Sequence, residues 1–546
     1  MASSALRYRQ ALRTLQAQPM LVRVTTVALV IVLVVDLLAL GGKSLSSDSS
    51  RPGVRAGGDR SKVATGAPGV NGPGVSSASA SGASTASASA GGATGTGGGG
   101  TGTGGGIVLG GDPGSPTGPR SPLTASDRGV TETTVKVVFP WFDISAYTSA
   151  SGTTTDEPIE GGPDAISAFV DYVNANGGLD GRTILPQIED FNPLNETDMQ
   201  ERCRRWAEDD KVFAVVDSSA WHSDHQLCVT QDHQTPLLSQ LALSEEWPKR
   251  GAPYLWWTAP TTEETVTDWV IWAVQTGRLT KDHKIGVVTG VKEEERLGKA
   301  AIERALGNAG IDTSTVDFAE IPGYTADIGL AQPAIAAAVS RMKGEGVDRL
   351  MMGLSALVFT SWMNQADAQE FFPLYLLSDF NNTVTTAEAL NADQHGKSLK
   401  GAIGPTNIRL GEVAPEKGGS YAPAQQRCND IWRAALPNAK NMDGSGVAMR
   451  WCDNIFLFTE AARRATRAND GVLTRLNWTE AMASIQNVEA GLTPNLSYGP
   501  GDYSGATMTK VVELHTDEEA FCTARGTTTT SHCNVEVEPY QPMRHF

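Results

Sequence analysis

"VDYVNANGGLDGRTI", from Val170 to Ile184, has the form of a helix that ends, turns and passes directly into a strand. The helix carries an apolar stripe with i, i+3, i+4, i+7 spacing, formed by Ile166, Phe169, Val170 and Val173. Asn-Gly at 176–177 supplies left-handed residues that end such a helix, and Asp-Gly at 180–181 is a turn signal. The following RTILPQIED predicts a strand, which Pro186 weakens or places near a sheet edge. This short helix-to-strand return is the unit of an open α/β sheet.

From Thr131 onward, strand and helix signals alternate along the chain. The first run has strands in TVKVVFPWF, KVFAVVDSS, TPLLSQ and YLWWTAP. After the helix TEETVTDWVIWAVQTG the pattern restarts, with strands in KIGVVTG, VDFAEI, DRLMMGLS and PLYLLSD. Longer helices follow in APAQQRCNDIWRAAL, VAMRWCDNIFLFTEAARRA and WTEAMASIQ. Two successive runs of strand–helix units predict an α/β protein with two doubly wound, Rossmann-like lobes.

The overall charge restricts the class of partner. The 546 residues carry a formal net charge of −17, and several of the positive charges lie at the extreme N-terminus. Because binding to phosphate backbones needs basic patches, we expect no nucleic-acid partner.

The N-terminal region predicts export. Residues 24–42 form an apolar stretch close to the ~20 residues that cross a bilayer. The preceding segment, 1–23, is basic, which predicts that it stays in the cytoplasm while the chain after Lys43 lies outside. We therefore expect a single-pass membrane anchor at the cell membrane. The alternative is a cleaved signal peptide with a small-x-small site at 39–41, which would give a secreted protein. Residues 43–130 are mostly Gly, Ser, Ala, Thr and Pro and predict a disordered linker.

Several segments resemble type 1 periplasmic binding proteins, most closely the branched-chain amino-acid-binding (Leu/Ile/Val-binding) subfamily of ABC importers. For the first lobe they are DAISAFVDYVNANGGLDGRTI, IEDFNP, KVFAVV and TPLLS, and for the second LGKAAIERALGNAGI, YTADIGLAQPAIAAAVSRMKGEGVDRLMMG and FPLYLLSD. The resemblance spans roughly 131–502. It implies a clamshell whose lobes are joined by three crossovers near 258–262, 403–406 and 491–495. One lobe would contain 131–258 and 403–490, and the other 259–402 and 491–546 with the C-terminal tail.

The chain also departs from this subfamily. Members often carry a lipid-attachment cysteine after the signal, and here no cysteine precedes Cys203. The turns that hold an amino acid in the subfamily read DSSAWHSD (217–224) and SQLALS (239–244), and Leu297 replaces the tyrosine before Gly298. The resemblance therefore implies the fold without implying that the ligand is an amino acid.

In open α/β sheets, ligands bind outside the carboxyl ends of the strands, where helix N-termini offer free N–H groups. Trp141 and Trp221 are predicted to form an aromatic wall, while Ser218, Ser219 and Asp379 orient polar groups of a ligand. The alternative for each residue is strand-end packing or helix capping. The full set of candidate ligand-binding residues is Trp141, Asp143, Ser218, Ser219, Trp221, His222, Ser239, Ser355, Asp379 and Asn381.

The stretch WHSDHQLCVTQDH contains His222, His225 and His233, three of only eight histidines. A zinc-ligand or acid–base role is possible, but a capped helix start with surface histidines is the interpretation we favour. The folded part contains no H-E-x-x-H, G-x-S-x-G or P-loop motif. We therefore expect no catalytic residues, no metal and no cofactor.

Six cysteines allow 15 pairings. Proximity of the predicted helices favours Cys203–Cys228 and Cys428–Cys452, and Cys522–Cys533 would close a short polar loop in the C-terminal tail. We expect all three to be structural disulfides, in keeping with an oxidising compartment.

The sequence thus predicts an extracytoplasmic protein that captures a small polar solute between two lobes and delivers it to an ABC permease. A ligand-sensing receptor domain of a signalling system is the first alternative. An enzyme built on the histidines is the second. Ligand would act by stabilising the closed form of the two lobes.

Overall fold

The computed structural model describes residues 107–109, 122–141, 162–192, 195–218, 221, 224–241, 243–322, 328–413, 415–437, 447–525 and 532–546. No helix within these ranges is both long and apolar enough to span a bilayer. The predicted anchor or signal at 24–42, and most of the predicted linker, lie outside the described residues.

The first sheet is formed by five parallel strands in the order β3-β2-β4-β5-β6. Their bounds are β2 Thr134–Trp141, β3 Thr183–Asp190, β4 Ala214–Asp217, β5 Leu237–Ser239 and β6 Leu255–Trp257. β3 lies at the edge, as Pro186 suggested, and Pro186 stands opposite Val137 of β2. Strands β4, β5 and β6 are short and fully buried, so they have the hydrophobic runs typical of parallel sheets.

The helix-to-strand turn of the opening stretch forms as predicted. Helix α4 (Pro163–Ala175) ends at Asn176, and positive φ angles follow at Gly177, Gly178 and Asp180. Gly178 cannot be replaced without displacement, because a Cβ there would lie 2.0 Å from the carbonyl oxygen of Arg182. The turn thus returns the chain into β3 beside β2.

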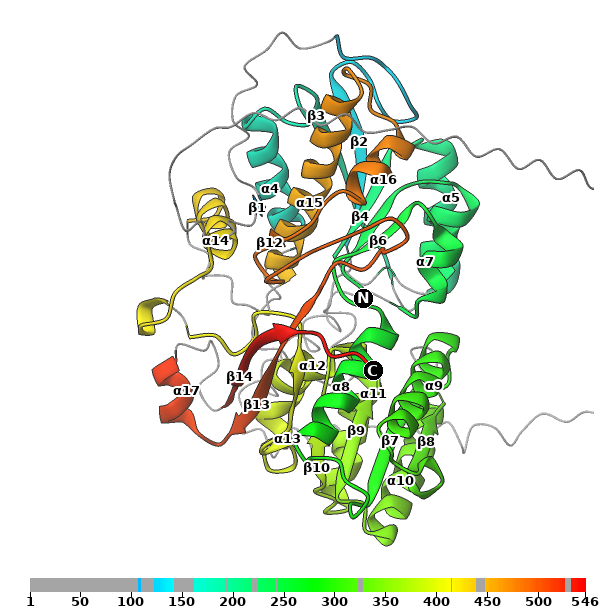
Figure 1. The fold of residues 1–546 in the computed structure, drawn as a ribbon, viewed down its shortest axis with the longest axis vertical. Helices are drawn as coiled ribbons and strands as arrows, with labels where there is room; N and C mark the ends of the chain where they lie inside the picture. Colours follow the sequence, from blue (N-terminus) through cyan, green and yellow to red (C-terminus); the bar gives the residue numbers. More distant parts are fainter. Residues whose placement is uncertain are drawn as a thin grey trace, which may run out of the picture. The chain divides into compact units, whose positions relative to one another are not determined.

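Helices cover both faces of this sheet. They are α5 (Glu196–Arg204), which continues as the π-helical turn η1 (Arg205–Asp209), α6 (Asp224–Leu227) with η2 (Cys228–Asp232), α7 (Glu246–Gly251), α14 (Pro423–Ala435), α15 (Val447–Ala468) and α16 (Arg475–Met482). Figure 1 shows α4 beside α15, and Phe169 and Phe456 of these helices are in edge-to-face contact. The C-terminal half of the chain therefore completes the core of the first sheet.

The second sheet has seven strands in the order β14-β13-β11-β10-β9-β7-β8. Five are parallel: β7 (Ile285–Gly290), β8 (Asp317–Ile321), β9 (Arg349–Gly353), β10 (Leu374–Leu376) and β11 (Ile403–Thr406). The neighbouring helices are α8 (Thr262–Gln275), α9 (Glu293–Asn308), α10 (Ile328–Glu345), α11 (Ala356–Ala368), α12 (Thr383–Thr386) and α13 (Ala392–Leu399). Two parallel-stranded α/β units thus follow one another, as the alternating pattern predicted.

Two details of the second sheet differ from the sequence interpretation. Residues 403–406, expected at a crossover, form β11, and the chain leaves the sheet after them. The C-terminal tail is not a simple loop. It forms two antiparallel strands, β13 (Met508–Thr516) and β14 (His532–Pro542), with α17 (Glu519–Arg525) between them. In β14 the run Val535–Glu538 alternates apolar and acidic residues, but the prolines at 539 and 542 break this pattern, so its strand character was not recognised.

The three predicted disulfides are confirmed. They are Cys203–Cys228, Cys428–Cys452 and Cys522–Cys533, with Cα–Cα distances of 6.3, 6.0 and 5.5 Å. Each joins elements that are close in sequence, which is why local proximity sufficed to predict the pairs.

The segments that pass between the two sheets are hydrogen-bonded to one another. The Trp257 amide donates to the Tyr503 carbonyl over 2.8 Å, and the Arg409 amide donates to the Leu492 carbonyl over 3.0 Å. The buried carboxylate of Asp453 on α15 accepts the amides of Gly491, Leu492 and Thr493 at 2.6, 2.9 and 3.3 Å. These contacts fix the passage that follows the short strand β12 (Val488–Glu489).

Candidate functional site

The carboxyl end of β4 is the centre of a hydrogen-bond network in the first sheet. The Asp217 carboxylate accepts the Ser239 hydroxyl at 2.9 Å and the Trp221 amide at 3.1 Å. The Asn454 side chain, on α15, donates to the Asp217 carbonyl at 2.6 Å and to Ser218 Oγ at 2.8 Å. Ser218 and Ser239, predicted as ligand residues, are thus held on either side of Asp217.

Arg450, in the first turn of α15, is positioned by the same network and was not predicted. Ser218 Oγ donates to the Arg450 carbonyl at 3.2 Å, and Arg450 Nη1 donates to Gln240 Oε1 at 2.7 Å. Its Nε is buried and has no hydrogen-bond partner among the described residues. Burial lowers the pKa of the guanidinium, while the charge of Asp379 raises it. The Nε–H of Arg450 is therefore a donor that a ligand beside the ends of β4 and β5 could use.

Asp379 follows β10 in the second sheet and belongs to the predicted set. Its two oxygens accept the Thr406 hydroxyl at 2.9 Å and the Asn407 amide at 2.6 Å. The Asp379 side chain is half-buried. Burial raises the pKa of its carboxyl group to about 6, and this effect outweighs the two hydrogen bonds and the charge of Arg450, which lower the pKa. Among the described residues, Asp379 and Arg450 share no direct hydrogen bond or ion pair. The Asp379 carboxylate, beside the second sheet, and the Arg450 guanidinium, beside the first, are therefore close enough for each charge to shift the pKa of the other group.

Two other predicted residues lie on the second sheet's side. Ser355 stands at the N-terminus of α11, and its buried hydroxyl has no hydrogen-bond partner in the described structure. Asn381 adopts a positive φ of 55° and donates from Nδ2 to the Gly353 carbonyl at 2.7 Å. Asn381 therefore holds the loop that carries Asp379 against the end of β9.

The aromatic residues of the predicted wall occupy different environments. Trp141 is the last residue of β2 and half-buried, and its ring lies 2.7 Å from the position a Cβ would take at Gly162. Trp221 has no exposed surface and packs against Phe191 and Trp206, with ring centroids 5.0 and 4.7 Å away. In this conformation Trp221 is part of the first sheet's hydrophobic core. The other three members of the predicted set, Asp143, Ser219 and His222, lie outside the described residues.

Contacts between the two sheets' helices surround the start of α9. Lys292 Nζ lies 3.4 Å from Glu196 Oε1, at the start of α5, and His225 Nε2 lies 2.6 Å from Glu196 Oε2. Leu297, on α9, packs against the hydrophobic cluster of the first sheet. His225 is 6% exposed, so the prediction that it is a surface histidine was wrong. The described conformation is therefore one in which the two α/β units touch.

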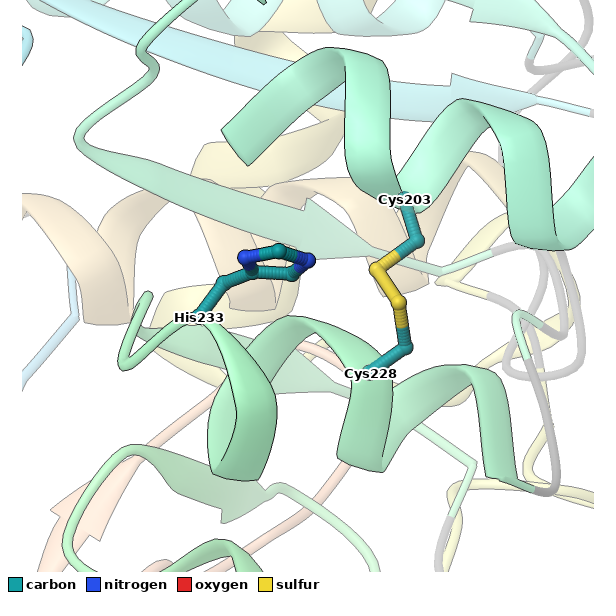
Figure 2. A group of neighbouring side chains, drawn as sticks. All are labelled: Cys203, Cys228 and His233. Atoms are coloured by element: carbon teal, nitrogen blue, oxygen red, sulfur yellow. A yellow bond between two sulfur atoms is a disulfide. The ribbon is translucent and has the colours of Figure 1, made fainter. Parts of the chain in front are cut away.

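Cys203, Cys228 and His233 converge in space, as Figure 2 shows, with potential ligand atoms within 4.8 Å of one another. The two sulfurs are joined in the disulfide, so neither is a thiolate. Since thiolates are the form of cysteine that binds zinc, this oxidised group does not provide a metal centre.

Glu295 is a buried acid in the first turn of α9, close to Lys292. It is 3% exposed, and Oε2 accepts the Lys292 amide at 3.1 Å. Burial raises its pKa from 4.5 to about 7. An added Cβ at Gly290 would meet its carboxylate at 1.9 Å, so the end of β7 accommodates this side chain only with glycine.

We predict that Glu295→Gln stabilises the protein at pH 8 and not at pH 5. Because the folded-state pKa is raised, the favourable protonated form is fully present below pH 4.5, and its contribution is lost as pH rises through about 7. Glutamine mimics the protonated acid, so the gain at pH 8 should be on the order of 2 kcal/mol. Urea unfolding at both pH values measures it. The exposed Glu293→Gln, in the same helical turn, is the control, and an equal gain at both pH values would contradict the prediction.

One family model matches most of the folded part of the chain. The sequence model of a family described as "Periplasmic binding protein" matches residues 144–513, about two-thirds of the chain. No curated protein sequence matches the chain at a significant level.

Solved structures share the fold at low sequence identity. One is described as a fatty acid ABC transporter substrate-binding protein from Thermomonospora curvata, with 16% identity, a TM-score of 0.56, and coverage of 77% of this chain and 95% of that chain. A branched-chain amino acid ABC transporter protein from Thermus thermophilus with bound valine has 13% identity, a TM-score of 0.55, and coverage of 75% and 96%. A solute-binding protein of an ABC transporter from Rhodopseudomonas palustris BisB5, in complex with 3,4-dihydroxybenzoic acid, has 12% identity, a TM-score of 0.53, and coverage of 75% and 98%.

Proposed function

Since this chain belongs to the periplasmic binding protein family, we propose that it captures a small polar solute between its two α/β lobes and delivers it to an ABC permease. We further propose that it acts outside the cytoplasm, tethered by the apolar segment 24–42 or secreted after its cleavage. The basic residues before that segment and three disulfides support export.

The observation that carries the proposal is the placement of opposite charges from the two sheets. Arg450 offers a buried Nε–H that no described residue accepts, beside the first sheet, and Asp379 offers a carboxylate beside the second. Guanidinium binds carboxylate through charge-assisted hydrogen bonds, and carboxylate binds ammonium in the same way. A solute with both groups, such as an amino acid, would meet both partners. The compounds named for the three solved relatives share a carboxylic acid group, which fits the Arg450 side.

The mechanism is a population shift. A solute that contacts Arg450 and Asp379 together binds the closed arrangement better than the open one, and its differential affinity stabilises closure. The ion pair of Lys292 with Glu196 would add little, because such partly exposed pairs contribute about 0–1 kcal/mol. No bond in the solute is made or broken, which agrees with the solute-binding character of the family.

A thermal-shift screen of the purified full chain tests this function. At pH 8 we expect an amino acid such as valine to raise Tm more than valinamide, which lacks the carboxylate, or decanoate and 3,4-dihydroxybenzoate, which lack the ammonium. If none of a wide set of amino acids and carboxylic acids raises Tm, the proposed capture of such solutes is wrong.

Asp379→Asn separates two solute classes. For a solute with an ammonium group, losing the carboxylate partner should weaken binding about ten- to a hundredfold. For a simple carboxylate, the same substitution removes a nearby like charge and should strengthen binding. Calorimetric titration of the strongest compound from the screen, with parent and variant at pH 8, measures the sign. Unchanged affinity for every compound would show that Asp379 does not face the solute.

A further inference from the structure

A short apolar segment of the predicted linker is part of the folded unit. Between Ser44 and Ser126 the sequence contains a single run of three large aliphatic residues, Ile107–Leu109. Glycines flank this run at 104–106 and at 110–111. Glycine allows unrestricted backbone directions on both sides, so the run can dock without the rest of the linker following it.

The segment forms strand β1 (Ile107–Val108), which pairs in parallel with β12. Ile107 stands opposite Val488 and Val108 opposite Glu489, and the Leu109 amide donates to the Glu489 carbonyl at 3.0 Å. The Leu109 side chain is only 3% exposed and belongs to the large hydrophobic cluster that includes the first sheet's core. Both backbone pairing and side-chain burial therefore hold this part of the linker.

The other edge of β12 is already occupied. Val488 exchanges two backbone hydrogen bonds with Leu496, at 2.9 and 2.8 Å, and Leu496 is in turn bridged to Ala506. The Glu489 side chain accepts the Ala424 amide at the start of α14 at 3.0 Å. β12 is therefore a fixed strand with one edge available to a further strand, next to the passage from the first sheet to the second.

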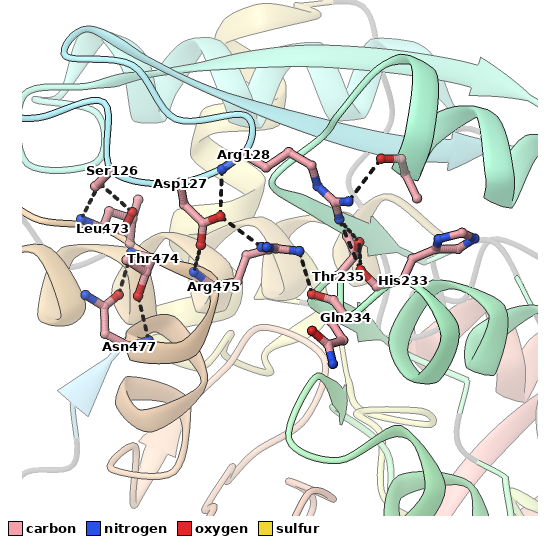
Figure 3. Close-up of polar contacts among 11 residues, drawn as sticks. Ser126, Asp127, Arg128, His233, Gln234, Thr235, Leu473, Thr474, Arg475 and Asn477 are labelled. Carbon is pink, nitrogen blue, oxygen red and sulfur yellow. Dashed lines mark hydrogen bonds and ion pairs between the residues drawn. The ribbon is translucent and has the colours of Figure 1, made fainter.

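A second attachment holds the chain where it enters the first sheet. Figure 3 shows Asp127 bonded to Arg475, with Oδ1 3.1 Å from Nε, and Ser126 Oγ donating to the Leu473 carbonyl at 2.7 Å. Arg128 donates to the Ala207 carbonyl at 3.0 Å and to the Thr235 hydroxyl. We call residues 126–128 the clamp. The clamp joins η1, the segment between η2 and β5, and α16, whereas β1 contacts a different part of the fold, β12.

We infer that the edge of β12, with the apolar site under Leu109, is an intramolecular docking site for Ile107–Leu109. When this site is occupied, the chain first contacts the folded unit at β12, beside the passage between the sheets, and not at the clamp. The free-energy cost of ordering three residues is similar in size to the stabilisation from one buried leucine and a few backbone hydrogen bonds. Docking is therefore reversible, and the segment can leave the site while the sheet stays folded.

Hydrogen exchange of the full chain, followed by mass spectrometry, tests the docking. The Leu109 amide, which donates to the Glu489 carbonyl, should exchange at least about tenfold more slowly than its intrinsic rate, as in a segment that opens locally. Leu109→Asp should abolish this protection, because it places a carboxylate in an apolar site. Leu109→Ile should retain it, and Val75→Asp, elsewhere in the linker, should leave it unchanged. The midpoint of urea unfolding should be the same in all variants.

Fast exchange of the Leu109 amide in the parent chain, or its retained protection in Leu109→Asp, would overturn the inference. Protein concentration provides the remaining test. Protection that does not vary over about a hundredfold range of concentration supports docking within one chain. Protection that rises with concentration would mean that a second copy donates the strand, and the intramolecular site would be refuted.

Discussion

Replacing Arg450 by methionine should lower affinity for a carboxylate solute by about ten- to a hundredfold, the expected effect of losing a hydrogen bond to a charged group. Methionine keeps an unbranched apolar stem and removes the guanidinium, which donates to Gln240. Titration calorimetry at pH 8, with the compound that gives the largest Tm increase, measures the loss. Arg450→Lys should bind with intermediate affinity, because it restores the charge without the two-pronged geometry.

The fold should tolerate the Arg450 substitution. Burial already lowers the pKa of this guanidinium, which means that its charged form is disfavoured by its surroundings. The Ser218 bond uses the Arg450 backbone carbonyl and is retained in the variant. Arg464→Met, on the same helix but paired with Glu460, is the matched control and should not change affinity. Equal affinity in parent and Arg450→Met would place the solute elsewhere.

Asp453→Ala should be the most damaging single change to stability among those considered. The substitution leaves the buried amides of Gly491, Leu492 and Thr493 without their acceptor. Unsatisfied buried amides cost about 1–3 kcal/mol each, so we expect a loss of roughly 3–5 kcal/mol. Water has little room to replace the carboxylate, because a Cβ at Gly491 would already lie 2.6 Å from Met449 and 2.9 Å from Cys428.

Urea unfolding followed by circular dichroism measures the Asp453 effect. Asp430→Ala, on the exposed side of α14, is the control and should change stability by less than about 0.5 kcal/mol. Asp453→Asn should fall between parent and alanine, because one oxygen still accepts. A loss below about 1 kcal/mol in Asp453→Ala would show that the passage after β12 does not depend on this carboxylate.

The fold could be predicted from sequence largely because its signals are local. The apolar stripe of α4, the Asn-Gly and Asp-Gly turns and the buried strands each occupy fewer than about 20 residues, the range in which periodicity is informative. The disulfides were predictable for the same reason, since their sequence separations are 25, 24 and 11. β14 was missed because Pro539 and Pro542 are unfavourable in strands, although antiparallel pairing with β13 supports it.

The candidate site was only partly predictable. Ser218, Ser239 and Asp379 were found because polar residues at strand ends have a recognisable position in the pattern. Arg450 was missed because its partner Gln240 is 210 positions away in sequence, and VAMRWCDN reads as the start of an ordinary amphipathic helix. Trp221 illustrates the opposite error. A tryptophan after a strand end suggests a wall for a ligand, but contacts with Phe191 and Trp206 place it in the core.

The late position of β13 in the chain has a consequence for biosynthesis. β11 pairs with β10 on one side and with β13 on the other, and more than a hundred residues separate β11 from β13. A nascent chain that has not yet reached Met508 therefore holds β11 with an unpaired edge, while the segments of the first sheet are already complete. Unpaired edges are templates for aggregation. We expect chains truncated before Met508 to aggregate during refolding, and the full chain, which supplies β13 to this edge, to aggregate less.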